Sequence, residues 1–556
     1  MSRAALLVVA LALLPGLSLV AAPDAFLADP LSELPVKLWC FERFPEIGLF
    51  GGRVEAIGFP NTGPLNNPDI VGTLVTGALR PLLGRVWAYD VLVLAQLVAS
   101  ALAAWALARD LVEDAFAAAV AAVAFALAPV VLVYCVAGAV TDMLNLWPYP
   151  LCARHLLRAA RQGSPKDGAL AGLFAGLGFV TCPYNVLVFA AALVPAAPFA
   201  PWRRWRALLP AAIACVVTGG VIAGLYALRV RAIMDDPTSQ MSTALVGATR
   251  HAPPYPFLEP AHPSRYVAWL ADYVAVGKDA LIVRDAGSRY YRAFSPGLLV
   301  GALAVLGAVR RPAARPWLAV AIFAALASTG PFLAVTGDVA LPVAGNPAWL
   351  LLHHAVPGAS LLLEPFRYAI AAGLGLGVAA AFGAATLPRL AALAPVLVVA
   401  ELAIASPVPV PLPTARLAVP EAYWRLAGEP GAIVELPWFD RGTERFARVH
   451  FLHQLVHGRP IADEVLGFPP RYLRENQFTA GLLQAEKGDG VLRVEVTAPE
   501  RVDADRARLA ADGFSAIVVD PEAYATHDAR DRVRAALTAA FGEPVRGGGR
   551  EVWAVR

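Results

Sequence analysis

Acidic residues lie directly after the first apolar run of the sequence. Residues 5–20 read ALLVVALALLPGLSLV and carry no charge, and Asp24, Asp29 and Glu33 follow them. Asp29 comes about one to two helical turns beyond the run, and Pro30 fixes the direction of the chain after it. A carboxylate held at that point could remove a proton from a hydroxyl group. The alternative is that these acids are merely solvated and orient the first helix.

A further acid, Asp142, lies in VAGAVTDMLNLWPYP (136–150), at the end of another apolar run. Charged groups at this depth of a membrane usually face a cavity and serve a function. The alternative is a structural role, because Thr141 and Asp142 both suit the N-cap of a helix. The sequence leaves both interpretations of Asp142 open.

A basic residue, Arg367, begins the apolar part of LHHAVPGASLLLEPFRYAIAAGLGLGVAAAFGA (352–384). A guanidinium group can bind a phosphate with two parallel hydrogen bonds. His353 and His354 lie just upstream and are further candidates for binding a phosphate-containing donor. The alternatives are an ion pair with Glu364 or contact of the side chain with lipid phosphate.

Three histidines recur at helical spacing near the C-terminal third of the chain. The segment HFLHQLVHG places His450, His453 and His457 on one helical face, which could present imidazoles to a metal ion. Asp463 and Glu464 are nearby but stand at no fixed offset that completes a metal-binding motif. A structural role for these histidines is the favoured interpretation, and metal dependence stays open.

The composition indicates a polytopic membrane protein. Of the 556 residues, 58% are hydrophobic and 16% are charged, whereas soluble proteins carry about 25% charged residues. The formal net charge of +3 gives no sign of a nucleic-acid partner. Motifs of nucleotide-binding loops, serine hydrolases and zinc proteases are absent from the sequence.

Apolar stretches predict a mainly α-helical transmembrane bundle of about eleven spans. They lie near 4–22, 88–108, 115–136, 141–157, 168–181, 184–200, 207–228, 295–309, 316–335, 366–385 and 390–405. The basic connections 158–167, 201–206 and 310–315 fall on one side of this bundle. The positive-inside rule therefore predicts an N-in, C-out topology. The alternative is that residues 1–22 are a cleaved signal peptide. Residues 23–87 would lie outside in either case.

Two domains follow from this topology. Residues 1–405 form the transmembrane domain, with outer loops 23–87, 229–294 and 336–365. Residues 406–556 form an extracytoplasmic α/β domain after a Pro-rich, extended linker (406–420). Strands are predicted at 432–436, 491–497, 515–520 and 551–555, and amphipathic helices at 501–513 and 529–542.

The order of these parts resembles the GT-C class of bacterial integral-membrane glycosyltransferases, with the closest likeness to YfhO-like and family-39-like relatives. The resemblance rests on ADPLSELPVKLW (28–39), LARDLVEDAFAAAVAAVAFALAPVVL (107–132), VPGASLLLEPFRYAIAAGLGLGVAAAFG (356–383), and GAIVELPW (431–438) with HGRPIADE (457–464). These stretches are spread over most of the chain. They support the architecture better than they support a particular substrate.

The resemblance implies a transferase of the bacterial inner membrane. The donor would be a polyprenyl-phosphate-linked sugar, and the acceptor a glycan, lipid or protein outside the cytoplasm. Asp29 would be the catalytic base, with Asp24 as the second candidate, and Arg367 would bind the leaving phosphate, with or without a divalent metal. The sequence departs from these relatives at three places. Ala28 precedes Asp29 where they have Gly, Ala139 follows Gly138 where they have His, and Leu363 or Glu364 stands where they have the first Arg of their motif, so that Arg367 is the one matching Arg.

Two non-enzymatic functions are the alternatives. A flippase or transporter of a lipid-linked saccharide would favour inverted repeats and charges deep in the spans, and no clear repeat is found in the sequence. An inactive envelope assembly protein of the same fold would explain the departures from the relatives' motifs. We expect Asp29, Asp142 and Arg367 to meet in one outward-facing pocket if the chain is an enzyme.

Overall fold

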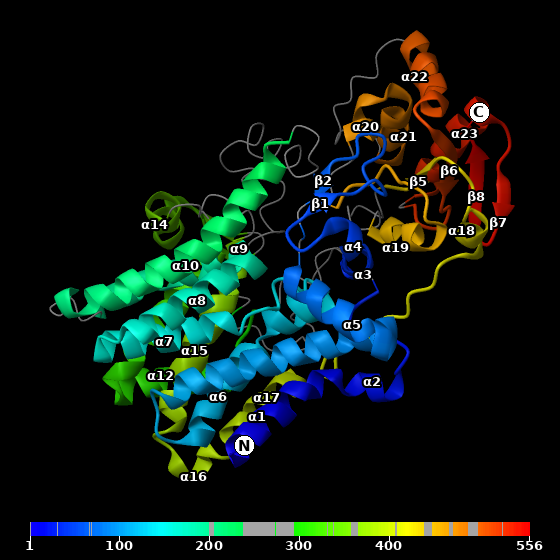
Figure 1. The fold of residues 1–556 in the computed structure, drawn as a ribbon. Coiled ribbons are helices and arrows are strands. Elements are labelled where there is room, and N and C mark those ends of the chain that lie inside the picture. Colours follow the sequence, from blue (N-terminus) through cyan, green and yellow to red (C-terminus); the bar gives the residue numbers. More distant parts are fainter. Residues whose placement is uncertain are drawn as a thin grey trace. The chain divides into compact units, whose positions relative to one another are not determined.

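The computed structural model describes most of the chain, and its description begins at residue 2. The described residues are 2–30, 32–65, 67, 69–199, 205–236, 273, 294–330, 332–336, 339–356, 365–405, 409–438, 448–465, 471–487, 499–524 and 526–555. The chain forms two compact units (Figure 1). The helical unit comprises Met1–Asp29, Asp69–Ala227 and Tyr255–Ala415, and the α/β unit comprises Pro30–Pro68, Leu228–Pro254 and Arg416–Arg556.

The helical unit begins with a bent apolar helix and a long kinked one. The first is built from α1 (Arg3–Leu13), η1 (Leu14–Leu17) and α2 (Ser18–Ala21). The second, α5 (Ile70–Arg109), has 40 residues and a kink at Gly84, whose φ of 76° and ψ of 175° suit glycine alone. The helix therefore begins well before the predicted start of this span at residue 88.

The next apolar helix is broken. α6 (Ala115–Ala126) and the π-helical segment η2 (Val131–Ala137) meet at an angle of 54°. Pro129 lies at the break, where its missing N–H and its ring interrupt the helical hydrogen bonds. π-helical turns inside membrane helices often mark functional sites.

The rest of the helical unit follows in chain order. Its elements are α7 (Pro148–Gln162), α8 (Pro165–Thr181), α9 (Pro183–Ala192), η3 (Val194–Phe199), α10 (Trp205–Met234), α12 (Leu298–Arg310), η8 (Pro312–Ala314), α13 (Arg315–Ser328), β3 (Phe332–Thr336), β4 (Val339–Gly345), α14 (Pro347–Ala355), η10 (Pro365–Arg367), α15 (Tyr368–Ala384), α16 (Pro388–Ala391) and α17 (Ala394–Ala405). The predicted outer loop 336–365 thus contains a strand and a helix.

Helix α15 lies at the centre of this unit, between α6, α12 and α13. Its glycines allow the neighbouring backbones to approach. A Cβ atom at Gly383 would stand 1.9 Å from the carbonyl oxygen of Leu303, and one at Gly375 would stand 2.8 Å from that of Trp317. Close packing of small residues is the usual way in which helices associate inside a membrane.

Four of the described helical segments are long and apolar enough to cross a membrane, or five if the bent pair α6 and η2 counts as one span. They are Arg3–Ala21, Ile70–Arg109, Arg206–Ile233 and Pro365–Ala384. The chain is thus a multi-pass, mainly helical protein.

A helix lies on each predicted span, but the count of eleven and the orientation remain predictions. The predicted span 141–157 is wrong at its start, since 141–147 form turns and α7 begins at Pro148.

The α/β unit is built on a four-stranded sheet in the order β5-β6-β8-β7. β5 (Ala432–Leu436) and β6 (Phe514–Val519) pair in parallel, whereas β8 (Arg550–Ala554) runs antiparallel to β6 and to β7 (Val545–Gly547). Its other helices are α18 (Glu421–Arg425), α19 (Arg448–His457), α20 (Arg471–Glu475), α21 (Gln477–Lys487), α22 (Pro499–Ala511) and α23 (His527–Phe541). Three predicted strands and both predicted helices are thereby confirmed; the predicted strand 491–497 lies outside the described residues.

Residues 30–68 belong to this α/β unit, although the chain leaves it again before returning. They contain α3 (Leu34–Glu42), α4 (Phe44–Ile47) and the short hairpin β1 (Gly52–Arg53) and β2 (Pro64–Leu65). The Trp39 indole donates to Gln454 Oε1 over 2.8 Å, and the ring of Phe59 packs edge-on against Phe514. The sequence analysis assigned these residues to an outer loop of the transmembrane domain, whereas the structure groups them with the α/β unit.

Candidate active site

The loop that carries Asp29 is held by backbone hydrogen bonds on both sides. The N–H of Phe26 donates to the carbonyl of Ala415 over 2.9 Å, and the N–H of Ala415 donates back over 2.8 Å. The N–H of Asp29 donates to the carbonyl of Ala137, the last residue of η2, over 2.8 Å. Asp29 is thus anchored to the broken span through its own backbone.

The side chains of this loop show why it is rigid. Ala25, Phe26, Leu27 and Ala28 are buried, each at most 5% exposed. Asp29 is half-buried. Each backbone N–H from residue 25 to residue 29 is hydrogen-bonded. A buried apolar loop bonded in this way keeps few alternative conformations, so it can hold one carboxylate in place at its end.

Arg367 reaches the same broken span from the start of α15. Its Nη2 donates to the hydroxyl of Tyr134, in η2, over 2.9 Å. The guanidinium lies 4.7 Å from the centre of the Tyr184 ring, a cation–π arrangement. Phe366 packs edge-on against Tyr134 at 4.9 Å. The predicted position of Arg367 at the beginning of a helix is confirmed, and aromatic rings fix its side chain.

Asp142 lies in the turns that follow η2 and is half-buried. The helix-cap interpretation is wrong, because α7 begins at Pro148 and its N-cap is Trp147. The hydroxyl of the preceding Thr141 donates to Asp69 Oδ2 instead. Asp142 and Arg367 both lie within electrostatic range of the Cys135 thiol in η2.

The backbone between η2 and Asp142 is strained. Ala139 has a φ of +56°, the one non-glycine positive φ among the described residues, and this conformation is costly for a side chain with a Cβ. A Cβ atom on the preceding Gly138 would stand 2.3 Å from the Tyr134 carbonyl oxygen. Strain of this kind gathers at functional sites.

The structure therefore brings three predicted residues to one segment. Asp29 contacts the end of η2, Arg367 contacts its middle, and Asp142 follows it. Asp24 is exposed at the start of the same loop. The roles assigned to these residues remain predictions.

Other predicted residues are not described in the same detail. His353 and His354 lie on α14, but their side chains are outside the described part of the structure. Glu364 and most of the predicted outer loop 229–294 also lie outside the described residues.

Sequence reasoning missed one buried acid that contacts the loop of Asp29. Asp90 is fully buried in α5, and its Oδ1 accepts the N–H of Leu27 over 2.8 Å. It stands as a lone acid in the apolar run VWAYDVLVLAQLV. The rule that singled out Asp142, that acids within spans are functional, applies to it equally.

The predicted histidine group forms a buried network in the α/β unit. Glu435 of β5 accepts from the Tyr423 hydroxyl over 2.8 Å and lies 2.7 Å from His453 Nδ1. His450 Nδ1 lies 3.2 Å from Asp463 Oδ1, and His457 Nε2 lies 3.6 Å from Glu435 Oε1. All six residues are nearly inaccessible to solvent.

Burial and neighbouring charges shift the pKa values of these groups in opposite directions. Burial alone lowers the pKa of His450, but Asp463 and Glu435 outweigh it and raise that pKa to about 9. Burial lowers the pKa of His453. Burial acts to raise the pKa of Glu435, yet the charges of His450 and His453 hold it well below its usual value. The network therefore contains an ionised acid beside a protonated histidine.

The histidines thus bond to protein carboxylates and a tyrosine. Among the described residues, no group of three or more His, Cys, Asp and Glu side chains is arranged to hold a metal ion. The structural interpretation of the histidines fits this geometry, and a metal requirement stays open.

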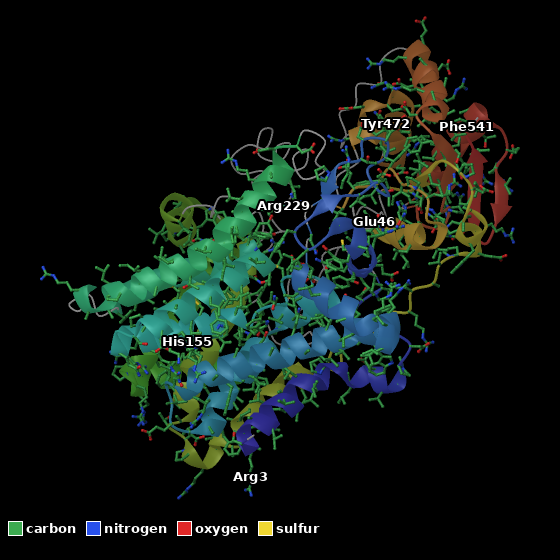
Figure 2. All side chains as sticks on the ribbon, in the orientation of Figure 1. Arg3, Glu46, His155, Arg229, Tyr472 and Phe541 are labelled. Atoms are coloured by element: carbon green, nitrogen blue, oxygen red, sulfur yellow. The ribbon has the colours of Figure 1, made fainter. Side chains whose placement is uncertain are left out.

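A third charged group lies where α5 ends. Arg154 and Arg158 of α7 each bond both carboxylate oxygens of Asp110. His155, labelled in Figure 2, lies 2.8 Å from Asp167. Burial acts to raise the pKa of Asp110, but its bonds to the two arginines lower it. These ion pairs join α7 to the end of α5 and to the start of α8, which is a structural role.

Comparison with known proteins supports the class of the helical unit. Residues 84–245 match the family described as dolichyl-phosphate-mannose-protein mannosyltransferases. No curated protein matches the chain. The matched segment covers less than a third of the sequence and contains Asp90, η2 and Asp142, but not Asp29 or Arg367. The match supports the GT-C class of membrane glycosyltransferases, the class that the sequence resembles.

Proposed function

We propose that this protein transfers a sugar from a polyprenyl-phosphate donor to an acceptor outside the cytoplasm, with Asp29 as the base. The observation that supports the proposal is that Asp29 and Arg367 each bond to η2, Asp29 through its backbone N–H to Ala137 and Arg367 through its side chain to Tyr134. A base and a cation near one segment are the two groups that such a transfer requires.

The chemistry has one step. Asp29 takes the proton of the acceptor hydroxyl as its oxygen attacks the anomeric carbon, and the bond from that carbon to the phosphate oxygen breaks. The leaving phosphate gains negative charge, which the Arg367 guanidinium stabilises. One base and no carboxylate nucleophile give inversion at the anomeric carbon.

The donor's chemistry fits a multi-pass helical unit. Its polyprenyl chain dissolves in the bilayer, while its phosphate and sugar remain at the interface. Tyr134 and Tyr184 place a hydroxyl and aromatic rings beside the Arg367 guanidinium, and aromatic residues favour membrane interfaces. The identity of the sugar and the acceptor is left to experiment.

The test measures donor consumption by purified protein in proteoliposomes. Polyprenyl-phosphate hexoses with radiolabelled sugars are supplied together with a cell-envelope extract as the acceptor source. Asp29→Asn keeps the size of the side chain but is a far weaker base, so we expect a fall of roughly 100-fold or more in the release of polyprenyl phosphate.

The matched control is Glu113→Gln, an exposed acid in the connection between α5 and α6. It should consume donor at the wild-type rate. Equal rates in wild type and Asp29→Asn, or no consumption of any donor by the wild type, would contradict the proposal and favour a transporter or an envelope assembly protein.

A further inference from the structure

Helix α5 touches both segments that carry the predicted acids. At one point, buried Asp90 accepts the N–H of Leu27, two residues before Asp29. At its N-terminus, Asp69 accepts the Thr141 hydroxyl, one residue before Asp142. Each acid of the helix therefore holds a neighbour of a predicted acid of the site.

The contact at Asp90 is specific. Its side chain is fully buried, and its Oδ2 has no hydrogen-bond partner among the described residues. The adjacent Tyr89 ring packs edge-on against Phe26 at 5.7 Å. Residues 89 and 90 thus hold two consecutive residues of the loop, one by its ring and the next by its backbone N–H. A buried carboxylate is costly, and here it satisfies a loop N–H that would otherwise be buried without an acceptor.

The contact at Asp69 is equally defined. Asp69 is 1% exposed, and its Oδ1 accepts the N–H of Gly72, which caps α5. Its other oxygen is thus available to the Thr141 hydroxyl. Asp69 is the N-cap of α5 and Asp90 lies further along it, with the kink at Gly84 between them.

We propose that α5 is the positioning element of the site, in which Asp90 fixes the loop of Asp29 and Asp69 fixes the turn of Asp142. This inference rests on the proposed transfer function. Neither Asp90 nor Asp69 touches substrate; each acts through one hydrogen bond. A misplacement of about 1 Å at a catalytic group can lower a rate about 100-fold, so loss of either bond should be visible in kcat.

The first experiment compares Asp90→Ala with Asp90→Asn in the donor-consumption assay. The amide oxygen of Asn can still accept the N–H of Leu27, whereas Ala cannot. We expect kcat to fall roughly 10- to 100-fold in Asp90→Ala with the KM for donor unchanged, and to remain within about threefold of wild type in Asp90→Asn.

A second readout does not depend on activity. Hydrogen exchange of the peptide covering residues 22–29 should speed up in Asp90→Ala and stay slow in Asp90→Asn, because the Leu27 N–H loses its acceptor in the former alone. Thr141→Val and Thr141→Ser form the parallel pair at Asp69. Val removes the hydroxyl and should lower kcat about 3- to 10-fold, while Ser should retain it.

The outcomes separate this inference from the proposed function. If Asp29→Asn matches wild type, the transfer function itself is wrong. If Asp29→Asn is inactive but Asp90→Ala keeps wild-type kcat and slow exchange, the positioning role is wrong. Asp90→Asn as impaired as Asp90→Ala would also overturn it, since the negative charge and not the hydrogen bond would then matter.

Discussion

The site in the helical unit and the histidine network in the α/β unit both gather acids and bases from distant segments, yet they differ in burial. Asp29, Asp142 and Arg367 are half-buried. Glu435, His450 and His453 are at most 2% exposed. A partly exposed charged group can meet a substrate, whereas a fully buried one can only meet the protein.

The two regions also differ in what holds the charges. In the site, backbone bonds, aromatic rings and the buried acids Asp69 and Asp90 hold the segments. The predicted acids Asp29 and Asp142 lie at the ends of the loops that are held. In the network, the charged side chains bond to one another. The comparison teaches that clustering of ionisable residues does not by itself mark an active site, and that the way in which they are held distinguishes the two cases.

The strongest test of this distinction removes the central acid of the network. Glu435→Leu leaves His453 buried without the carboxylate that it contacts over 2.7 Å, while His450 keeps Asp463. Breaking such a buried pair costs about 3–5 kcal/mol. We expect faster hydrogen exchange across β6 and α19. The control Glu429→Leu removes an exposed acid and should cost less than about 1 kcal/mol. Equal exchange in both variants would contradict a structural network.

The next largest effect should be the pH dependence of the stability of the α/β unit. The folded pKa of His450, about 9, exceeds its unfolded value of 6.5. Its stabilisation is therefore fully present below pH 6.5 and is lost as pH rises through 9, a change of about 3 kcal/mol. The groups facing it are Asp463, Glu435, Glu486 and His453. The measurement is hydrogen exchange of α19 between pH 6.5 and 9, corrected for the intrinsic exchange rate. In His450→Gln, the exchange rate should no longer depend on pH in this range. The same pH dependence in the variant and in the wild type would contradict the role of His450.

A smaller effect is expected from Arg367→Lys in the site. Lysine keeps the charge but lacks the planar fork that bonds Tyr134 and stacks on Tyr184. We expect kcat for donor consumption to fall about 10- to 100-fold, with no change in hydrogen exchange of the α/β unit. In Tyr134→Phe, which loses one hydrogen bond, kcat should fall by a smaller factor. Full activity in Arg367→Lys would show that the guanidinium geometry is unimportant.

The smallest effect should follow from Gly84→Ala. The φ of 76° and ψ of 175° at Gly84 are strained for any residue with a side chain, although no heavy atom lies within 4 Å of the new Cβ. The kink angle should change and weaken the contacts of α5 with the loop of Asp29 and the turn of Asp142. We expect kcat to fall about 3- to 10-fold. Gly77→Ala, in the same helix and with open space around it, is the matched control and should leave kcat unchanged.

Local features were predictable from the sequence. Apolar runs predicted helices, short stretches rich in β-branched residues predicted β5, β6 and β8, and Gly542 predicted the end of α23. Charges at the ends of apolar runs predicted Asp29, Asp142 and Arg367 as candidates. These features depend on residues a few positions apart, so the order of amino acids alone sets them.

Tertiary structure decided which distant segments meet. Asp90 bonds Leu27 across 63 positions and Arg367 bonds Tyr134 across 233. Residues 30–68 joined the C-terminal part of the chain, and Glu435 gathered His450, His453 and His457. Such contacts depend on how whole faces pack and on which buried polar groups must find partners. A pattern read along the chain carries neither kind of information.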